Sequence, residues 1–319
     1  METISSIEQP VDQYKENDLQ IEGWRDARHL LHLYAQIIGK IRLRLHPKLN
    51  HWWHATLAIS TVGWTTGIIP YKEGCFEIEL NFIDHVLWIR KSDGLGQHIN
   101  LNQPSIKMFH DTLFDSLKSL GIEVSIDEMP FDESKVKSHI LFNKDDRPIT
   151  YNPDFSYNLW KVQLETDITL QIFKGRFSGM SSPVQLFWHE FDLSLTFFSG
   201  RKVLSSNGMD KISKEAYSHE FISFGFWAGD DNIDEPAYYS CVYPEPKNLS
   251  EEQLIPLEAF WNHQETGTTA ILTYRDLQNS PDPRQSLLDF MESAFMVGSR
   301  KAKWDKDLML LRPLNYFLH

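Results

Sequence analysis

Apolar side chains recur at spacings of three and four residues along the stretch before Pro47. This spacing places them on one face of an amphipathic helix. Pro47 ends the predicted helix because proline has no amide hydrogen to donate to the preceding turn. The residues on the apolar face are Leu30, Tyr34, Ile37, Ile38, Ile41 and Leu45.

The same reasoning predicts three further helices. One covers 106–120 and is capped by Gly121. A second covers about 153–177, where Asn152-Pro153 supplies a cap and a first-turn proline. The last begins at Asp282-Pro283, and the stripe Leu288, Met291, Phe295 and Gly298 continues along it.

Between these helices the apolar residues alternate with polar ones, which is the pattern of half-buried strands. The clearest case is Phe76 to Phe82, followed by a turn at Asp84-His85 and a return strand. The predicted strands cover 56–60, 76–82, 86–90, 122–126, the strand-rich stretch 185–198, 220–227, 237–243 and 268–274.

The order helix, strands, helix occurs twice, which indicates an internal duplication. Lys40-Ile41-Arg42 closes the first helix and Lys174-Gly175-Arg176 closes the third. Trp53-His54 and Trp188-His189 are predicted to open the strands that follow. The expected fold class is therefore α+β, with two tandem related modules whose antiparallel sheets carry helices packed on one face.

The predicted division of the chain follows from this order. Residues 1–20 lack periodicity and are expected to form a flexible N-terminal arm, and 21–127 form the first module. The polar stretch 128–151 is the predicted linker, and 152–319 form the second module.

Charge and composition narrow the classes of function. The formal net charge is −13 and there is no long run of Lys or Arg, which opposes binding to nucleic acid. No apolar run approaches the roughly 20 residues of a membrane helix, and no signal peptide is visible, so a cytoplasmic location is expected. Neither Cys75 nor Cys241 belongs to a C-x-x-C pair.

Recognisable motifs occur in eight segments of the chain, namely 33–43, 50–54, 82–85, 191–193, 198–201, 216–220, 225–227 and 243–246. Together these segments resemble a bacterial family of unknown function, DUF5996. The resemblance covers roughly Trp24 to Trp304 and implies no activity, because none is assigned to the family.

The basic residues offer one candidate site. Arg25, His29, His32, Gln36 and Lys40 share a helix face, and a solvated polar stripe is its simplest interpretation. The alternative is an anion pocket in which Lys40, Arg42 and Arg176 converge from the two modules.

Histidines offer a second candidate site. His54, His85, His219 and the adjacent Glu220 could act as acid or base groups, whereas the spacing of His51, His54, His85, His189 and His219 does not form a simple metal motif. Asp192 is a further possible partner for His219.

These residues lead to a prediction of function. We expect a small anionic or aromatic ligand, bound or chemically changed between the modules by Lys40, Arg42 and Arg176, with Trp53, Trp188 and Trp227 around it. Two alternatives stay open: a non-catalytic interaction or scaffold protein, and a metal-dependent enzyme built on the histidines. The sequence indicates no particular cofactor.

Overall fold

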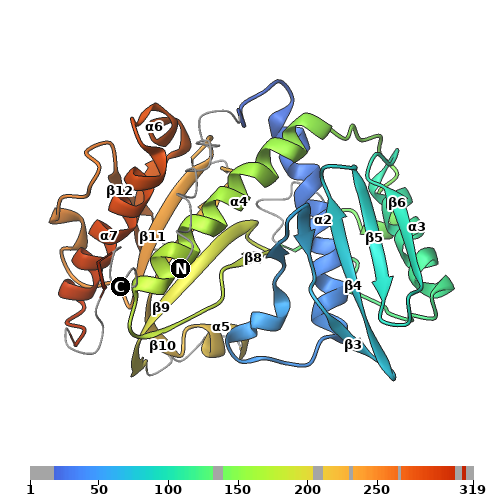
Figure 1. Ribbon diagram of the computed structural model, residues 1–319, viewed down its shortest axis with the longest axis horizontal. Helices are drawn as coiled ribbons and strands as arrows, with labels where there is room; N and C mark the ends of the chain where they lie inside the picture. Colours follow the sequence, from blue (N-terminus) through green and yellow to red (C-terminus); the bar gives the residue numbers. More distant parts are fainter. Residues whose placement is uncertain are drawn as a thin grey trace, which may run out of the picture.

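The computed structural model describes residues 18–131, 139–203, 211–229, 233–264, 267–305 and 311–313. Long helices flank two antiparallel sheets, one in each half of the chain (Figure 1). The predicted α+β class is confirmed. The helices are α2 (Trp24–Leu45), α3 (Ile106–Ser119), α4 (Pro153–Arg176), α5 (Lys211–Ala216), α6 (Tyr274–Asn279) and α7 (Pro283–Lys301).

Side-chain caps fix where three of the long helices begin. The side chain of Asn152 accepts a hydrogen bond from the Phe155 amide at the start of α4, and that of Asp282 accepts one from the Gln285 amide at the start of α7. Ser105 caps α3 in the same way. These bonds satisfy amides that have no partner inside the helix, as the sequence predicted for α4 and α7.

The first sheet has six strands in the order β1-β2-β4-β5-β6, with β3 also paired to β4. Strand β4 holds the predicted alternation, since Phe76, Ile78 and Leu80 are buried. The turn predicted at Asp84-His85 is present. The strands are β1 (Ala58–Ile59), β2 (Gly63–Thr65), β3 (Ile69–Tyr71), β4 (Gly74–Asn81), β5 (Val86–Lys91) and β6 (Gly96–Asn100).

The second sheet has seven strands in the order β12-β13-β11-β10-β9-β7, with β8 also paired to β9. The longest pairings join β10 to β9 and to β11, and all pairs are antiparallel. The strands are β7 (Met180–Ser181), β8 (Gln185–Phe187), β9 (Asp192–Lys202), β10 (His219–Trp227), β11 (Ala237–Tyr243), β12 (Phe260–Gln264) and β13 (Gly267–Thr273).

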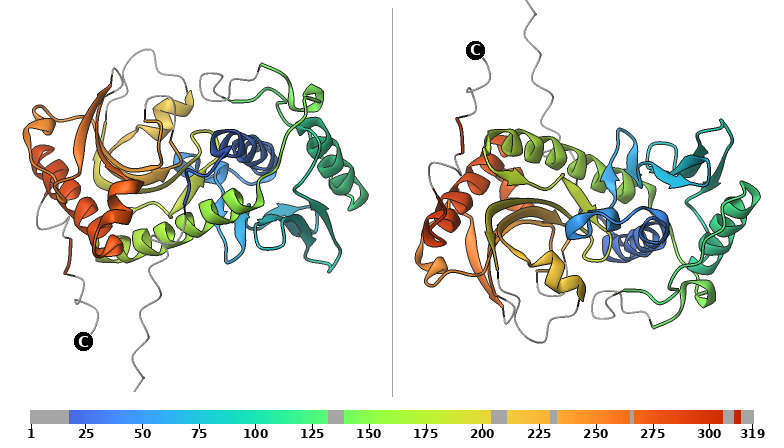
Figure 2. Two further views of the ribbon diagram at one scale, coloured as in Figure 1. Left: turned by 90° about the horizontal axis from the view of Figure 1, so that it is seen from above. Right: turned by 90° about the horizontal axis from the view of Figure 1, so that it is seen from below.

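Helices cover one side of each sheet, and the two covered sides face opposite ways. Figure 2 shows α2 and α3 on one side of the first sheet, whereas α4 and α7 lie on the other side of the molecule against the second sheet. The short helix α5 lies on the side of the second sheet that α4 and α7 leave uncovered.

Polar side chains and backbone groups join the two halves through a shared core. The indole of Trp64 donates to Oε1 of Gln163 at 2.7 Å, and the indole of Trp160 donates to the carbonyl of Ser60 at 3.1 Å. Leu57 and Leu186 form an antiparallel bridge between the halves. Tandem modules fit this arrangement, and the buried apolar residues of both halves form one continuous cluster.

The predicted strand over 122–126 is wrong. This segment is not paired to any described strand, and the chain that follows it runs along α2. There the ammonium of Lys40 donates to the carbonyls of Asp127 and Met129. A lysine on the neighbouring helix therefore satisfies backbone groups that a strand partner would otherwise satisfy.

The prediction that the two Trp-His pairs open strands is wrong. Trp53-His54 lies in the 3-10 segment η1 (Asn50–Ala55), and Trp188-His189 lies in the turn between β8 and β9. Part of the predicted linker is packed, because Phe142 in η2 (Phe142–Lys144) is buried beside α3. The expected arm falls mostly outside the described residues, as only 18–20 are described.

Candidate functional site

The second sheet has a mainly apolar face and a more polar face, because successive side chains of its strands point to opposite sides. Phe197, Ile222, Phe224 and their neighbours on the apolar face are fully buried under α4 and α7. We call the opposite side the open face. Its central residues are Asp192, Ser194 and Thr196 on β9, Ser223, Gly225 and Trp227 on β10, and Tyr239 and Cys241 on β11.

Cross-strand register brings a carboxylate, a phenol and an indole together on the open face. Trp227 pairs with Asp192, and Gly225 pairs with Tyr239. The hydroxyl of Tyr239 donates a hydrogen bond to Oδ2 of Asp192. The rings of Trp227 and Tyr239 lie 5.4 Å apart at 55°, so they form two walls of a corner that contains the carboxylate.

Gly225 is needed for this corner. A Cβ at this position would lie 2.5 Å from Cε1 of Tyr239 and 2.5 Å from the carbonyl oxygen of Leu193. The missing side chain allows the Tyr239 ring to lie across β10 and reach Asp192. Within the described residues the indole nitrogen of Trp227 is buried and has no hydrogen-bond partner.

The titratable groups of the open face are strongly perturbed. Burial, and then the charge of Asp192, raise the pKa of Cys241 to about 12. The same two causes raise the pKa of Tyr239 well above its usual value. Burial also raises the pKa of Tyr217, with smaller effects from Cys241, Glu190 and Asp192.

The first half of the chain closes one end of the open face. The His51 ring lies 5.0 Å from the Phe198 ring and 5.4 Å from the His219 ring. Trp53 stacks on His51 at 5.6 Å. The ion pair of Lys48 and Glu215, at 2.7 Å, fastens this segment to α5.

The backbone of η1 is strained at this contact. His51 and Trp52 both adopt left-handed conformations, with φ of 50° and 61°. Two consecutive residues with side chains rarely do so, because Cβ crowds the carbonyl. Nδ1 of His51 and Nε1 of Trp52 are buried without a partner among the described residues.

The predicted basic residues bind different parts of the protein. Arg42 donates to the carbonyl of Thr66. Arg176 donates to Oε2 of Glu292 at 2.7 Å and to the carbonyl of Arg312 at 2.6 Å. Among the described residues, Lys40, Arg42 and Arg176 therefore have no hydrogen-bond partner in common. The C-terminal ends of α2 and α4 also lie apart in both views (Figures 1 and 2).

The simplest interpretation of the polar stripe, a solvated face, is wrong for its C-terminal part. His32, Gln36 and Lys40 are all less than a tenth exposed. His32 Nε2 lies 3.0 Å from the carbonyl oxygen of Trp188, and Gln36 exchanges hydrogen bonds with the backbone of Phe131. These polar groups lie at an internal contact of α2, which the helical period alone does not reveal.

The predicted tryptophans lie in three places. Trp53 is in η1, and Trp227 is on β10 in the open face. Trp188 is buried against Gly39 of α2, where a Cβ would lie 2.2 Å from its ring. Trp188 therefore belongs to the core between the halves.

The predicted acid and base groups are also dispersed. His54 is buried in η1 and accepts a hydrogen bond from the Leu49 amide at 3.2 Å. Nδ1 of His85 lies 2.9 Å from the hydroxyl of Tyr151, in the first half. Burial lowers the pKa of both histidines. Of the three histidines predicted as acid or base groups, only His219 lies at the open face, where its Nδ1 lies 3.0 Å from the hydroxyl of Ser218.

Glu220 has partners on the neighbouring strand. Its Oε2 accepts from Ser199 at 2.9 Å and from Arg201 at 2.7 Å. Within the described ranges, no three His, Cys, Asp or Glu side chains converge in a way that could hold a metal ion. The metal-dependent alternative therefore gains no support from the described part of the chain.

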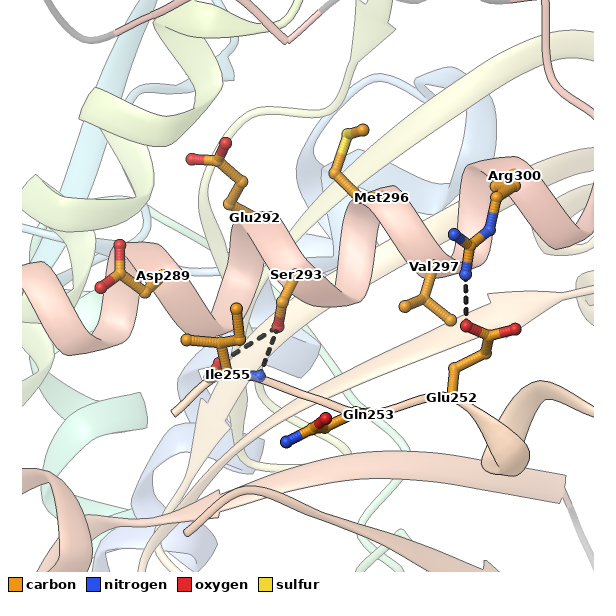
Figure 3. A pocket seen from close by; sticks show the side chains of 9 residues that line it. All are labelled: Glu252, Gln253, Ile255, Asp289, Glu292, Ser293, Met296, Val297 and Arg300. Carbon is orange, nitrogen blue, oxygen red and sulfur yellow. Dashed lines mark hydrogen bonds and ion pairs between the residues drawn. The ribbon is translucent and has the colours of Figure 1, made fainter. Parts of the chain in front are cut away.

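A groove lies on the other side of the second half, between α7 and the segment after η3 (Leu249–Glu251). Its volume is about 590 Å³. Figure 3 shows Ser293 and Ile255 joined by hydrogen bonds across its floor and the Arg300–Glu252 ion pair at one end. Ile255 and Met296 are both more than half exposed.

Sequence reasoning missed most of the open face. Asp192 was considered only as a partner of His219, and Tyr239 and Cys241 were considered only as strand residues. The signal was present in β9, where Asp192, Ser194 and Thr196 alternate with large apolar residues. A polar stripe in a strand marks a face that has no apolar layer packed on it.

The comparisons with known proteins add a family. No curated protein matches the chain, and no solved structure matches it. In the described part of the chain, every helix is too short or too polar to span a bilayer. A family model matches residues 17–310, and it confirms the resemblance seen in the motifs: the chain belongs to DUF5996, a family of unknown function.

Proposed function

We propose that this protein binds a small organic molecule on the open face of the second sheet, next to η1. One observation carries the proposal. Side chains from three neighbouring strands converge there: the Tyr239 hydroxyl donates to the Asp192 carboxylate, and the Trp227 ring lies 5.4 Å from the Tyr239 ring. Tyr239 and Cys241 keep part of their surface accessible, and a few polar groups among aromatic rings are typical of small-molecule sites.

The position of the family motifs supports this location. Four of the segments that resemble the family border the open face: 50–54, 191–193, 216–220 and 225–227. They come from both halves of the chain and meet through His51 and His219. The proposed site therefore lies where the two halves meet, and it includes Trp227 and His219 but not Lys40, Arg42 or Arg176.

The chemistry of the face suits an aromatic or partly apolar molecule. Trp227 and Tyr239 offer ring faces, and the paired hydroxyls of Thr196 and Ser223, 2.8 Å apart, offer hydrogen bonds. His219 remains the candidate acid or base among the predicted histidines. Lys40, Arg42 and Arg176 have protein partners elsewhere, so the proposal does not use them.

Filling the face tests the proposal. Thr196 lies at its centre, so Thr196→Phe should obstruct any ligand. We would screen a set of small fragments that includes cations, anions and uncharged molecules, and measure thermal shift and tryptophan fluorescence. The matched control is Thr268→Phe, because Thr268 is half-buried on β13 of the same sheet but outside the open face.

Fragments that stabilise the wild-type protein should lose at least a tenfold affinity in Thr196→Phe and little in Thr268→Phe. Equal binding by both variants would show that the ligand site lies elsewhere. Binding by none of the fragments would also count against the open face as a ligand site.

The groove on α7 favours a second function, that of an interaction protein. Exposed Ile255 and Met296 adjoin the carboxylate of Asp289, so the groove would suit a partly apolar, positively charged segment of a partner. Met296→Glu should then abolish capture of such a peptide, whereas Met180→Glu, at an exposed methionine on β7, should not. Failure of basic amphipathic peptides to bind the wild-type protein would remove this candidate.

A further inference from the structure

We infer that the molecule bound on the open face is an organic cation, such as an ammonium group with an apolar body. This inference rests on the proposed function and specifies its ligand. It follows from the charges and rings around Asp192. These point away from the anionic ligand that the basic residues of the sequence had suggested.

Asp192 supplies the negative charge. Its carboxylate raises the pKa of Tyr239, of Cys241 and of Tyr217, which is the effect of an anion on neighbouring groups that would lose a proton. The Tyr239 hydroxyl holds Oδ2 in place, so the carboxylate is oriented before any ligand arrives.

The rings beside Asp192 complement this charge. A cation above an aromatic face is attracted to the negative centre of the ring, and the attraction grows where water is excluded. Trp227 is opposite Asp192 in the strand register, and its ring is inclined by 55° to that of Tyr239. An ammonium group in this corner would contact two ring faces and a carboxylate.

The nearby charges favour the same sign. Glu190 acts on Tyr217 together with Asp192, so a second carboxylate lies close to the face. Two basic residues at its margin already have carboxylate partners, since Arg201 binds Glu220 and Lys48 binds Glu215. An anionic ligand would meet repulsion here that a cation would not, and the net charge of −13 adds to the difference.

Three probes of one shape test the inference. Choline is the cation, the alcohol in which carbon replaces its quaternary nitrogen is the uncharged isostere, and tert-butylacetate is the anion. We would measure their dissociation constants by calorimetry and by the fluorescence of the tryptophans. Choline should bind at least tenfold more tightly than the uncharged isostere, and the anion should bind most weakly.

Variants separate charge from shape. Asp192→Asn retains an oxygen that can accept from Tyr239, and it should remove the preference for choline over the uncharged isostere. Trp227→Leu should weaken choline more than the uncharged isostere, because it removes a ring face. Asp115→Asn, at an exposed aspartate of α3, is the matched control and should change neither value. Urea unfolding would verify that each variant is folded.

The outcomes also separate this inference from the proposed function. If choline binds no better than the uncharged isostere, or if Asp192→Asn keeps the preference, the ligand is not a cation. Binding of the uncharged or anionic probe that Thr196→Phe abolishes would then still support the open face as a site. If Thr196→Phe leaves the binding of choline unchanged, both ideas are wrong.

Discussion

The imidazole rings of His51 and His219 lie 5.4 Å apart and connect the two halves of the chain at the open face. His51 comes from η1, where its ring also stacks on that of Trp53. Burial, and then the nearby His219, lower the pKa of His51. The contact between the halves therefore favours an uncharged His51.

This arrangement predicts that the protein loses stability in mild acid. Burial likewise lowers the pKa of His29, His54 and His85. Near pH 6.5 these histidines therefore bind protons in the unfolded chain more readily than in the folded protein. Because the unfolded state then binds more protons, the free energy of unfolding should fall as pH drops below about 6.5. The slope is up to about 1.4 kcal/mol per pH unit for each proton of difference.

Urea unfolding from about pH 5 to about pH 8 measures this slope. His51→Gln should make the slope shallower, because glutamine does not titrate. His98→Gln, at an exposed histidine of β6, should leave it unchanged. A wild-type protein that is as stable at the acid end as at the neutral end would contradict the prediction.

Periodicity predicted the long helices well, because their apolar stripes and caps are local signals. The α4 cap at Asn152 and the turn before His85 are examples, since each depends on a few neighbouring residues. The open face could not be predicted in this way. Asp192 and Tyr239 meet only through the register of three strands, and that register depends on the whole sheet.

The burial of Lys40 is a second feature that periodicity in the sequence could not predict. Its spacing on the helix matches an exposed stripe, and the sequence does not reveal that the 127–131 segment returns to cover it. The left-handed backbone of His51 and Trp52 was equally invisible, since no glycine marks it. The open face, the burial of Lys40 and the backbone of His51 and Trp52 all depend on contacts between segments that are distant in the sequence.

Gly39 offers a sharp test of the packing between the halves. A Cβ there would lie 2.2 Å from Cδ1 of Trp188, a ring that is 5% exposed and cannot move aside. Gly39→Ala should therefore cost at least ~1–3 kcal/mol in urea unfolding. Gly175→Ala is the control, because no atom lies within 4 Å of its added methyl, and alanine favours helix by ~0.5–1 kcal/mol. Equal effects of both changes would show that Trp188 does not pack on α2.

Lys40 should act as a structural residue and not as a ligand group. Lys40→Met would leave the carbonyls of Asp127 and Met129 without their donor, at a cost of ~1–3 kcal/mol. Amide hydrogen exchange should also become faster over 127–131. Lys118→Met, at an exposed site on α3, should alter neither quantity. If Lys40→Met instead left stability intact but abolished ligand binding, Lys40 would belong to a functional site.

Cys241 should be an unreactive thiol whose reactivity reports on Asp192. The thiolate is the nucleophile, and a pKa of about 12 leaves very little of it near neutral pH. In a Cys75→Ser background, iodoacetamide should therefore modify Cys241 much more slowly than it modifies an unfolded control of the same protein. Asp192→Asn removes a charge that disfavours the thiolate, so it should speed the reaction several-fold, while Asp289→Asn should not. After burial, the charge of Asp192 is the largest cause of the raised pKa of Cys241. An unchanged reaction rate in Asp192→Asn would therefore mean that the carboxylate lies farther from the thiol than the sheet register implies.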